Sequence, residues 1–217
     1  MTLNLSKPIL YLITRGATSE TTTPQSPEFL AILQQASAAV SAGVQLIQIR
    51  EKQLTARNYF ELTRAVVAIA RGSETRVLIN EYAGIALAAE ADGVHLTTSS
   101  IPADVIRKLC SAKFLIGVST HSLAEVRNAK SQGADFAVLG PIFPTPSKAQ
   151  YGRPLGPSLL AQAAQDVAPF QLLALGGISI ENAKECLNAG AAGIAGISLF
   201  GEPSRLAATV REMKALM

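Results

Sequence analysis

Two glycine-containing segments near the end of the chain have the composition of a phosphate-binding site. Gly176 and Gly177 follow one short apolar run, and the next run, Gly193–Ser198, ends in Ile197 and Ser198. Because glycine has no Cβ, backbone N–H groups in such segments can approach an oxyanion closely, and a helix that begins nearby adds a favourable dipole. The alternative is that these glycines serve only tight turns. Their position after the last two predicted strands favours a phosphate site.

Donor side chains cluster in a second segment. Gln48, Arg50 and Lys52 alternate along an extended run, so all three side chains can point to the same side. Together with Lys148, they have the charge and the hydrogen-bond donors that a diphosphate or an anionic ring substituent requires. For Arg50 alone, the alternative is an ion pair with a carboxylate such as Glu51. The whole set favours an anion-binding site.

One carboxylate and two histidines complete the candidates for chemistry. Glu81 could bind Mg²⁺ through a carboxylate oxygen, and the alternative is a solvated side chain or one paired with Arg50. His121 follows a predicted strand, and histidine is the usual proton carrier near neutral pH. Its alternative is a hydrogen-bonded histidine at the rim. His95 lies inside an apolar run and is predicted to be a structural, hydrogen-bonded residue.

Eight short apolar runs position these residues, and a helical pattern follows each run. Most runs are apolar on both sides of the pleat, as expected for strands buried on both faces of a parallel sheet. The predicted strands are Ile9–Thr14, Leu46–Arg50, Arg76–Asn80, Gly93–Thr97, Phe114–Thr120, Phe136–Gly140, Gln171–Gly176 and Gly193–Leu199. The predicted helices, with apolar residues spaced by three and four, are Pro27–Ala42, Thr55–Arg71, Tyr82–Glu90, Pro102–Ala112, Leu123–Gly133, Pro157–Val167, Ile180–Gly190 and Ser204–Met217.

This repeat predicts an α/β fold: a single domain over residues 1–217 that forms one parallel, eight-stranded (β/α)8 TIM barrel. Gly43, Gly133 and Gly190 stand where helices need a left-handed C-cap. Polar residues gather after nearly every strand, where barrel enzymes build their active sites. An open, doubly wound sheet is the alternative, but no Gly-x-Gly-x-x-Gly motif follows the first strand. Residues Arg15–Ser26 are predicted to form a mobile loop.

Composition argues against several other classes of protein. The 217 residues are 48% hydrophobic and 16% charged, which is enough for one sizeable core and too apolar for wholesale disorder. The net charge of +3 suits anionic substrates, but the absence of Trp and of a basic stripe argues against nucleic-acid binding. No apolar run reaches membrane-spanning length, and Met1–Pro8 do not resemble a signal peptide. Cys110 and Cys186 are predicted to be buried or half-buried thiols in a reducing cytoplasm.

Taken in order, these segments resemble the thiamine phosphate synthase/TenI family. The resemblance extends from Leu10 to Phe200, which is nearly the whole chain. No single segment is specific for the family, but together they are. They are Gln48–Lys52, Leu78–Glu81, Ala91–Leu96, Gly117–Ser122, Gly140–Lys148, Gly176–Ile178 and Gly196–Ser198.

The resemblance implies a barrel enzyme of thiamine biosynthesis with bound phosphorylated substrates. A thiazole phosphate would be held at Gly176, Gly177, Ile197 and Ser198. In the synthases, an aminopyrimidine diphosphate is held at the positions that match Gln48, Arg50, Lys52, Asn80 and Lys148, and the pocket is also lined at those that match Ser119, Thr145 and Ser147. The synthases ionise the pyrimidine diphosphate, and the thiazole nitrogen captures the resulting cation. Mg²⁺ stabilises the leaving diphosphate.

The sequence departs from the synthases at the metal. They have aspartate at the positions that match Glu81 and Ser100, so Ser100 removes a charge from a site that needs hard anionic oxygens. The TenI-type thiazole tautomerases of the same family need no metal and no cofactor. They move a proton on a carboxylated thiazole phosphate with a histidine that matches His121. Because lost electrostatic stabilisation of a leaving group is costly, the sequence favours the tautomerase, with His121 as the catalytic residue.

Three alternatives stay open. The intact set of Gln48, Arg50, Lys52 and Lys148 fits a thiamine phosphate synthase, which requires Mg²⁺ and binds both substrates. The second is a protein that binds a thiazole phosphate without converting it. The third is another barrel isomerase that acts on a phosphorylated substrate, since fold alone does not fix function. Neither nucleic acid nor membrane is a predicted partner, and a homo-oligomer is compatible with the sequence.

Overall fold

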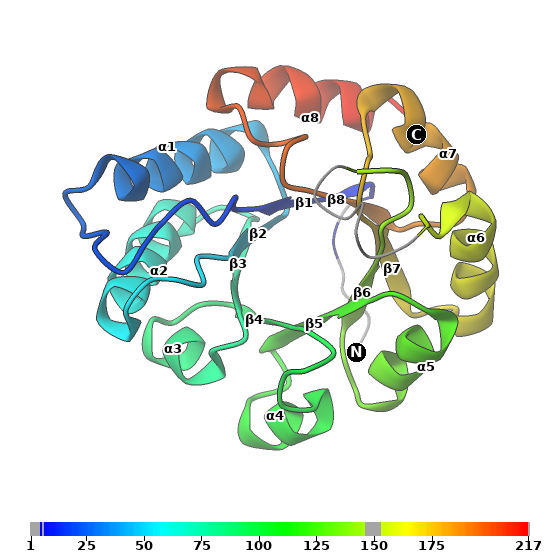
Figure 1. The fold of residues 1–217 in the computed structure, drawn as a ribbon, viewed down its shortest axis with the longest axis horizontal. Coiled ribbons are helices and arrows are strands. Elements are labelled where there is room, and N and C mark those ends of the chain that lie inside the picture. Colours follow the sequence, from blue (N-terminus) through cyan, green and yellow to red (C-terminus); the bar gives the residue numbers. More distant parts are fainter. Residues whose placement is uncertain (1–4, 6, 146–152, 217) are drawn as a thin grey trace.

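The computed structural model describes residues 5, 7–145 and 153–216 and shows a closed barrel of parallel strands surrounded by helices (Figure 1). The strands pair in chain order, and β8 pairs with β1 to close the ring. This confirms the predicted (β/α)8 barrel. The strands are β1 (Ile9–Ile13), β2 (Leu46–Ile49), β3 (Arg76–Asn80), β4 (Gly93–Leu96), β5 (Leu115–Thr120), β6 (Phe136–Leu139), β7 (Gln171–Ala174) and β8 (Gly193–Gly196). The helices are α1 (Pro27–Ala42), α2 (Ala56–Ala70), α3 (Ala83–Ala88), α4 (Ala103–Leu109), α5 (Leu123–Ser131), α6 (Gly156–Val167), α7 (Ile180–Asn188), the 3₁₀ helix η2 (Pro203–Arg205) and α8 (Leu206–Lys214).

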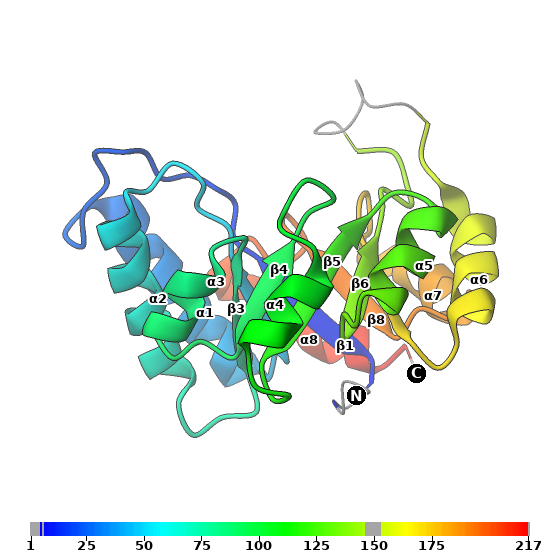
Figure 2. The ribbon, with the colours of Figure 1, turned by 90° about the horizontal axis from the view of Figure 1, so that it is seen from below.

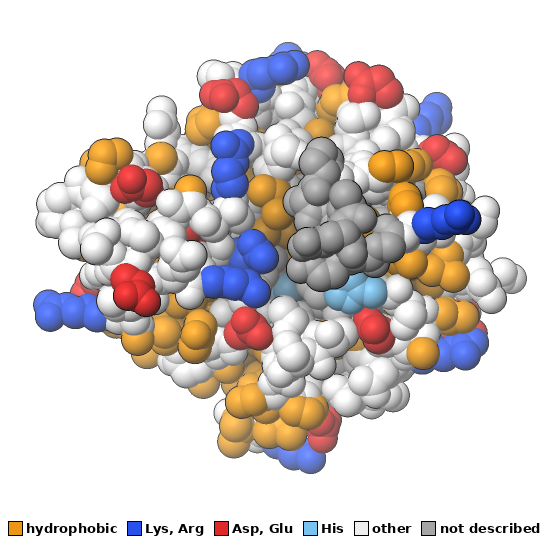
Figure 3. All heavy atoms as spheres, viewed as in Figure 1, with side chains coloured by type: hydrophobic (Ala, Val, Ile, Leu, Met, Phe, Trp, Pro, Cys, Tyr) orange, Lys and Arg blue, Asp and Glu red, His pale blue; other side chains and the backbone are white. Residues whose placement is uncertain are grey.

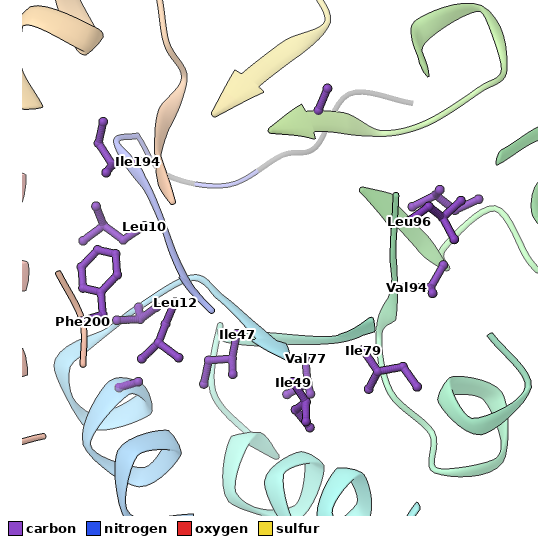
Figure 4. Close-up of a cluster of buried hydrophobic side chains, with 14 of the residues drawn as sticks. Leu10, Leu12, Ile47, Ile49, Val77, Ile79, Val94, Leu96, Ile194 and Phe200 are labelled. Carbon is purple, nitrogen blue, oxygen red and sulfur yellow. The ribbon is translucent and has the colours of Figure 1, made fainter. Parts of the chain in front are cut away.

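Side chains that alternate along the strands divide the core into two layers. Tyr11 and Phe136 belong to a cluster that fills the inside of the barrel. Leu10 and Leu12, their neighbours on the other face of the pleat, belong to a larger cluster between the strands and the helices. Figure 4 shows this outer layer along β1 to β4, with Phe200 packed against β1. Burial on both faces explains why the strands are apolar throughout.

Strand β8 is shorter than predicted: it ends at Gly196, so the prediction of a strand over Gly193–Leu199 is wrong beyond that residue. A Cβ on Gly196 would lie 2.9 Å from Cβ of Leu199, so the chain folds back over this glycine. Phe200 thereby becomes fully buried in the outer layer. The same reversal brings residues 197–199 to the mouth of the barrel. Helix α4 is also shorter than predicted and ends at Leu109.

Glycines follow three helices in the predicted left-handed conformation. Gly43, Gly133 and Gly190 have φ values of +75°, +79° and +91°. Gly43 is the C-cap of α1, and the other two follow the C-caps of α5 and α7 by one residue. Each glycine therefore ends its helix at a turn that leads into the next strand.

The two cysteines and the hydropathy of the helices agree with what the composition predicted. Cys186 is buried and Cys110 is half-buried, and both are free thiols, as predicted. In the described part of the chain, no helix has the length and the apolar composition needed to cross a membrane.

The loop from β1 to α1 lies on the side where the strands end (Figure 2). It is tied to the loop after β2 by Glu51, whose side chain is almost fully buried. The Glu51 carboxylate accepts hydrogen bonds from the N–H of Gly16 at 3.0 Å, the N–H of Thr18 at 3.2 Å and the Thr18 hydroxyl at 2.8 Å. The predicted loop is confirmed. Its attachment through Glu51 was not predicted, and its mobility stays a prediction.

Candidate active site

A cavity of about 530 Å³ opens at the carboxyl ends of the strands. Every candidate site residue in the described part of the chain lines it, whereas Ser147 and Lys148 lie outside the described residues. Two parts of the lining, on either side of β1, differ in their chemistry. We call Gln48, Arg50, Lys52, Asn80 and Glu81 the side-chain wall, and Gly176, Gly177, Ile197 and Ser198 the backbone wall; Ser119, His121 and Thr145 also line the cavity.

The backbone wall presents amide groups to the cavity. Among the residues that the structure describes, the N–H groups of Gly177, Ile197 and Ser198 have no hydrogen-bond acceptor. Helix α7 begins directly after this wall, and Oδ1 of Asn182 in its first turn accepts a hydrogen bond at 2.8 Å from the N–H of the N-cap residue Ser179. An oxyanion at this wall would satisfy the amides and lie near the positive end of the α7 dipole.

Glycine is required in the backbone wall for two reasons. Gly176 and Gly177 have φ values of +97° and +65°, which other residues rarely adopt. A Cβ on Gly177 would also lie 2.7 Å from the carbonyl oxygen of Phe143 and would collide with that of Pro144. The loop after β6 therefore packs directly on this wall. The tight turn and the exposed amides are two properties of the same segment, so the two explanations for these glycines do not exclude each other.

Hydrogen bonds order the side-chain wall. Gln48 donates from Nε2 to Oδ1 of Asn80 at 3.1 Å, and Asn80 donates from Nδ2 to Oε2 of Glu81 at 2.9 Å. Glu81 has a φ of +69°, an unusual value for a residue other than glycine. The N–H of Glu81 donates to the carbonyl of His95 at 3.0 Å, which holds this turn in place. Strained backbone of this kind is concentrated at functional sites, so the turn supports a role for Glu81 in the cavity.

Glu81 supplies the carboxylate of this wall. Its Oε1 accepts hydrogen bonds from the hydroxyls of Thr97 at 3.1 Å and Ser100 at 2.9 Å, so Ser100 supports Glu81. In the described residues, no group of three Asp, Glu, His or Cys side chains could hold a metal ion. Because Mg²⁺ is often bound by one or two carboxylates together with substrate phosphates, Glu81 fits this ion only when a diphosphate supplies further oxygens.

Arg50 and Lys52 bring positive charge to the cavity. The ion pairs found in the described part of the chain involve other residues, so the alternative of an Arg50 pair with Glu51 or Glu81 is not observed there. Figure 3 shows Lys and Arg side chains near the centre of this face, close to a histidine. Both cations are therefore available to an anionic ligand.

His121 forms a close pair with Glu125 at the cavity. The N–H of His121 donates to Oε2 of Glu125 at 2.6 Å, and Nδ1 of the imidazole lies 3.2 Å from the same oxygen. The carboxylate orients the ring, and the His121 side chain remains 46% exposed. A histidine held by a carboxylate and open to a ligand can act as a proton carrier.

His95 lies beneath the cavity and is almost fully buried. Its Nδ1 is 3.1 Å from the Tyr11 hydroxyl and its Nε2 is 2.9 Å from Oγ of Ser119. Burial and the positive charge of Arg50 lower the pKa of His95 to about 3, so the ring is neutral. His95 is hydrogen-bonded through both ring nitrogens, as predicted for a structural histidine.

The structure adds to the predicted site some polar strand-end residues that sequence reasoning noted without a specific role, and two carboxylates to which it gave no supporting role. Thr97, Ser99 and Thr120 line the cavity, and Glu51 and Glu125 support the lining from behind. Glu125 had a signal, since it follows His121 by four residues, a spacing at which side chains meet on a helix. For Glu51 the signal was its place between Arg50 and Lys52.

Comparison with known proteins assigns the chain to a family. Residues 10–200 match the family described as thiamine monophosphate synthase. The chain belongs to this family. A putative thiamine-phosphate synthase of Geobacter sulfurreducens is 48% identical over 160 residues, which cover 74% of this chain and 75% of the relative. The thiamine-phosphate synthase of Chlorobium luteolum is 39% identical over 179 residues, or 82% of this chain and 84% of the relative.

A solved structure supports the same assignment. The thiamine phosphate pyrophosphorylase of Pyrococcus furiosus has a TM-score of 0.77 and 28% identity, and the match covers 95% of this chain and 94% of that protein. The family resemblance is confirmed, and the chain is an enzyme of thiamine biosynthesis. The preference for the tautomerase is not confirmed, since the names of these relatives favour the synthase.

Proposed function

We propose that this chain is a thiamine phosphate synthase, which joins an aminopyrimidine diphosphate to a thiazole phosphate and releases diphosphate. The observation that carries the proposal is the presence of two anion-binding walls in one cavity. Arg50 and Lys52 have no carboxylate partner in the described part of the chain, and the backbone wall offers its amides a few strands away. A tautomerase needs one phosphate anchor, whereas a synthase needs a site for each of two phosphorylated substrates.

The reaction follows from this division. The C–O bond between the pyrimidine methylene and the diphosphate breaks, and its electron pair leaves with the diphosphate. The thiazole nitrogen then donates its lone pair to the methylene carbon, and the new C–N bond leaves the positive charge on a thiazolium ring. Atoms and charge balance without an added proton or oxidant.

Each wall has a defined task in this reaction. Arg50 and Lys52 bind the departing diphosphate, and such preorganised charge is a large part of catalysis. The amides of Gly177 and Ser198 hold the phosphate of the thiazole, which fixes its nitrogen near the reacting carbon. Mg²⁺, when bound through Glu81 and the substrate phosphates, would supply further neutralisation of the diphosphate.

The thiazole tautomerase is a second candidate, favoured by the pair of His121 and Glu125. A proton carrier held by a carboxylate at the cavity wall suits proton transfer on a carboxylated thiazole phosphate. The synthase needs no such group, since its balanced reaction transfers no proton. Ser100 in place of a second carboxylate also suits this candidate, because it needs no metal.

One set of assays separates the two candidates. We expect wild-type protein to form thiamine phosphate from both substrates in Mg²⁺, to stop when the metal is chelated, and to continue in His121→Asn. Conversion of the carboxylated thiazole that persists with chelator and stops in His121→Asn, without thiamine phosphate formation, would overturn the proposal in favour of the tautomerase. Binding of thiazole phosphate without either conversion would overturn it in favour of a non-catalytic binder.

A further inference from the structure

Three side chains from separate strands form a buried hydrogen-bonded row beneath the cavity. Tyr11 on β1 and His95 on β4 are 0% and 1% exposed, and Ser119 on β5 reaches the cavity lining. The rings of Tyr11, His95 and Phe136 pack against one another with centroids 5.6 to 6.0 Å apart. A Cβ on Gly117 would lie 2.7 Å from Nδ1 of His95, so no side chain fits beside the imidazole there. The packing therefore leaves the ring little freedom to turn.

The protons in this row can be assigned by accounting for every donor. Among the residues that the structure describes, the Tyr11 hydroxyl has one hydrogen-bond partner, Nδ1 of His95 at 3.1 Å. A buried hydroxyl that has no acceptor is unfavourable, so the Tyr11 O–H donates to Nδ1. Since the ring is neutral, its one proton is then on Nε2. The opposite tautomer would leave the Tyr11 proton buried without an acceptor.

The direction of the Ser119 hydroxyl follows from the proton on Nε2 of His95. We propose that Tyr11 and His95 are positioning residues that fix Ser119 as a hydrogen-bond donor to the substrate. Nε2–H of His95 donates to Oγ of Ser119 at 2.9 Å. Ser119 therefore accepts this hydrogen bond on the side that faces the barrel interior. The Ser119 O–H has no acceptor in the described part of the chain and is left to point into the cavity.

A fixed donor selects the chemistry of its ligand. Ser119 would meet an atom with a lone pair, such as a phosphate oxygen or an unprotonated ring nitrogen, and would disfavour a donor group at the same place. The identity of that ligand as an aminopyrimidine diphosphate rests on the proposed function. The direction of the hydroxyl does not, because it depends on the buried row alone.

Nitrogen-15 NMR of the imidazoles reads the tautomer directly. The chain has two histidines, so labelling with ¹⁵N-histidine gives two sets of signals, and His121→Asn leaves only those of His95. We expect a protonated Nε2 and an unprotonated Nδ1 in the wild-type protein. A protonated Nδ1 would overturn the proposal, even in a protein with full synthase activity. The wild-type spectrum decides this point without any variant of the row.

Tyr11→Phe tests the coupling, with Tyr59→Phe as its matched control. Tyr59 is also buried, but its hydroxyl donates to the carbonyl of Ile49 at 2.7 Å and does not contact His95. We expect Tyr11→Phe to shift the His95 signals towards the other tautomer and Tyr59→Phe to leave them unchanged. An unchanged spectrum in a folded Tyr11→Phe protein would show that Tyr11 does not set the tautomer of His95 and would overturn its positioning role.

A double-mutant cycle tests whether Tyr11 acts on the substrate through Ser119. Loss of one oriented hydrogen bond should raise KM for the pyrimidine diphosphate roughly three- to tenfold in Tyr11→Phe, with a smaller change in kcat. In a Ser119→Ala background, Tyr11→Phe should have no further effect on KM. Equal losses in both backgrounds would show a structural role for Tyr11 and overturn this step. If the protein makes no thiamine phosphate, the NMR result still stands, so the two failures are distinguishable.

Discussion

The two walls of the cavity bind anions in different ways. The side-chain wall uses guanidinium, ammonium and amide groups, ordered by hydrogen bonds from Gln48 through Asn80 to Glu81. The backbone wall uses amides that the fold itself places, at glycines whose φ values no other residue adopts easily. The first wall can be changed one group at a time. The second can be changed only by altering the course of the chain.

The two walls also differ in their content of titratable side chains. The segments 175–179 and 196–201, which form the backbone wall and its surroundings, contain no titratable side chain. Among the described residues, charge and pH dependence in the cavity therefore come from the side-chain wall, from His121 with Glu125, and from the residues beneath the cavity. A diphosphate carries more charge than a monophosphate, so the division places the more highly charged substrate group at the wall with the cations.

Arg50→Ala should give the largest effect and the clearest test of the division. Removing one donor that stabilises negative charge in a transition state typically lowers kcat by about 10²- to 10³-fold. We expect a fall of that size in kcat/KM for the pyrimidine diphosphate, measured as thiamine phosphate formed. The dissociation constant for thiazole phosphate, measured by calorimetry, should stay within about twofold, since an amide wall without charge holds that group.

Arg57→Ala is the matched control for Arg50→Ala. Arg57 is an exposed residue of α2 outside the cavity lining, so the same change in net charge should leave both constants unaffected. An equal loss for the two substrates in Arg50→Ala, in kcat/KM for the pyrimidine diphosphate and in the affinity for thiazole phosphate, would contradict the division into two walls. One wall would then bind both anions.

Gly177→Ala should give the next largest effect, through the backbone wall. A left-handed φ costs a residue with a Cβ about 1–2 kcal/mol, and overpacking costs about 1–3 kcal/mol more. We expect the free energy of unfolding, measured with urea, to fall by about 3 kcal/mol, together with weaker binding of thiazole phosphate.

Gly133→Ala separates the two causes. Gly133 has a similar φ of +79°, but a Cβ there would have no neighbour within 4 Å. It should lose only the conformational part, about 1–2 kcal/mol, with thiazole phosphate binding unchanged. Equal losses of stability in the two variants would show that the contact with Phe143 and Pro144 contributes nothing.

Most of the fold could be predicted from the sequence, because a strand buried on both faces leaves a strong local signal. The end of β8 could not, since the reversal at Gly196 depends on Phe200 finding its place in the outer layer. In the cavity, alternation along β2 predicted that Gln48 and Arg50 would share the lining. The roles of the lining residues stay predictions.

Contacts between distant parts of the chain had no signal of this kind. Glu51 binds Thr18, which is 33 residues earlier, and His95 binds Tyr11, which is 84 residues earlier. A barrel brings such residues together only after it closes. Local pattern therefore predicted which residues line the cavity, but not which residues order it from below.

Acid should lower the free energy of unfolding through His95, which lies beneath the cavity. The pKa of His95 is about 3 in the folded chain, lowered first by burial and then by Arg50, against 6.5 for an ordinary histidine. The unfolded chain binds a proton below pH 6.5 that the folded chain does not, so the stability from His95 is complete above pH 6.5 and falls as the pH drops towards 3. At 1.36 kcal/mol per unit, this loss reaches about 2 kcal/mol at pH 5. Urea unfolding at pH 7 and pH 5 should show that loss in the wild-type protein, and the gap between wild type and His95→Asn should narrow by the same amount at pH 5. A gap independent of pH would mean that His95 takes up a proton in the folded barrel, and the buried row could not hold the tautomer assigned to it.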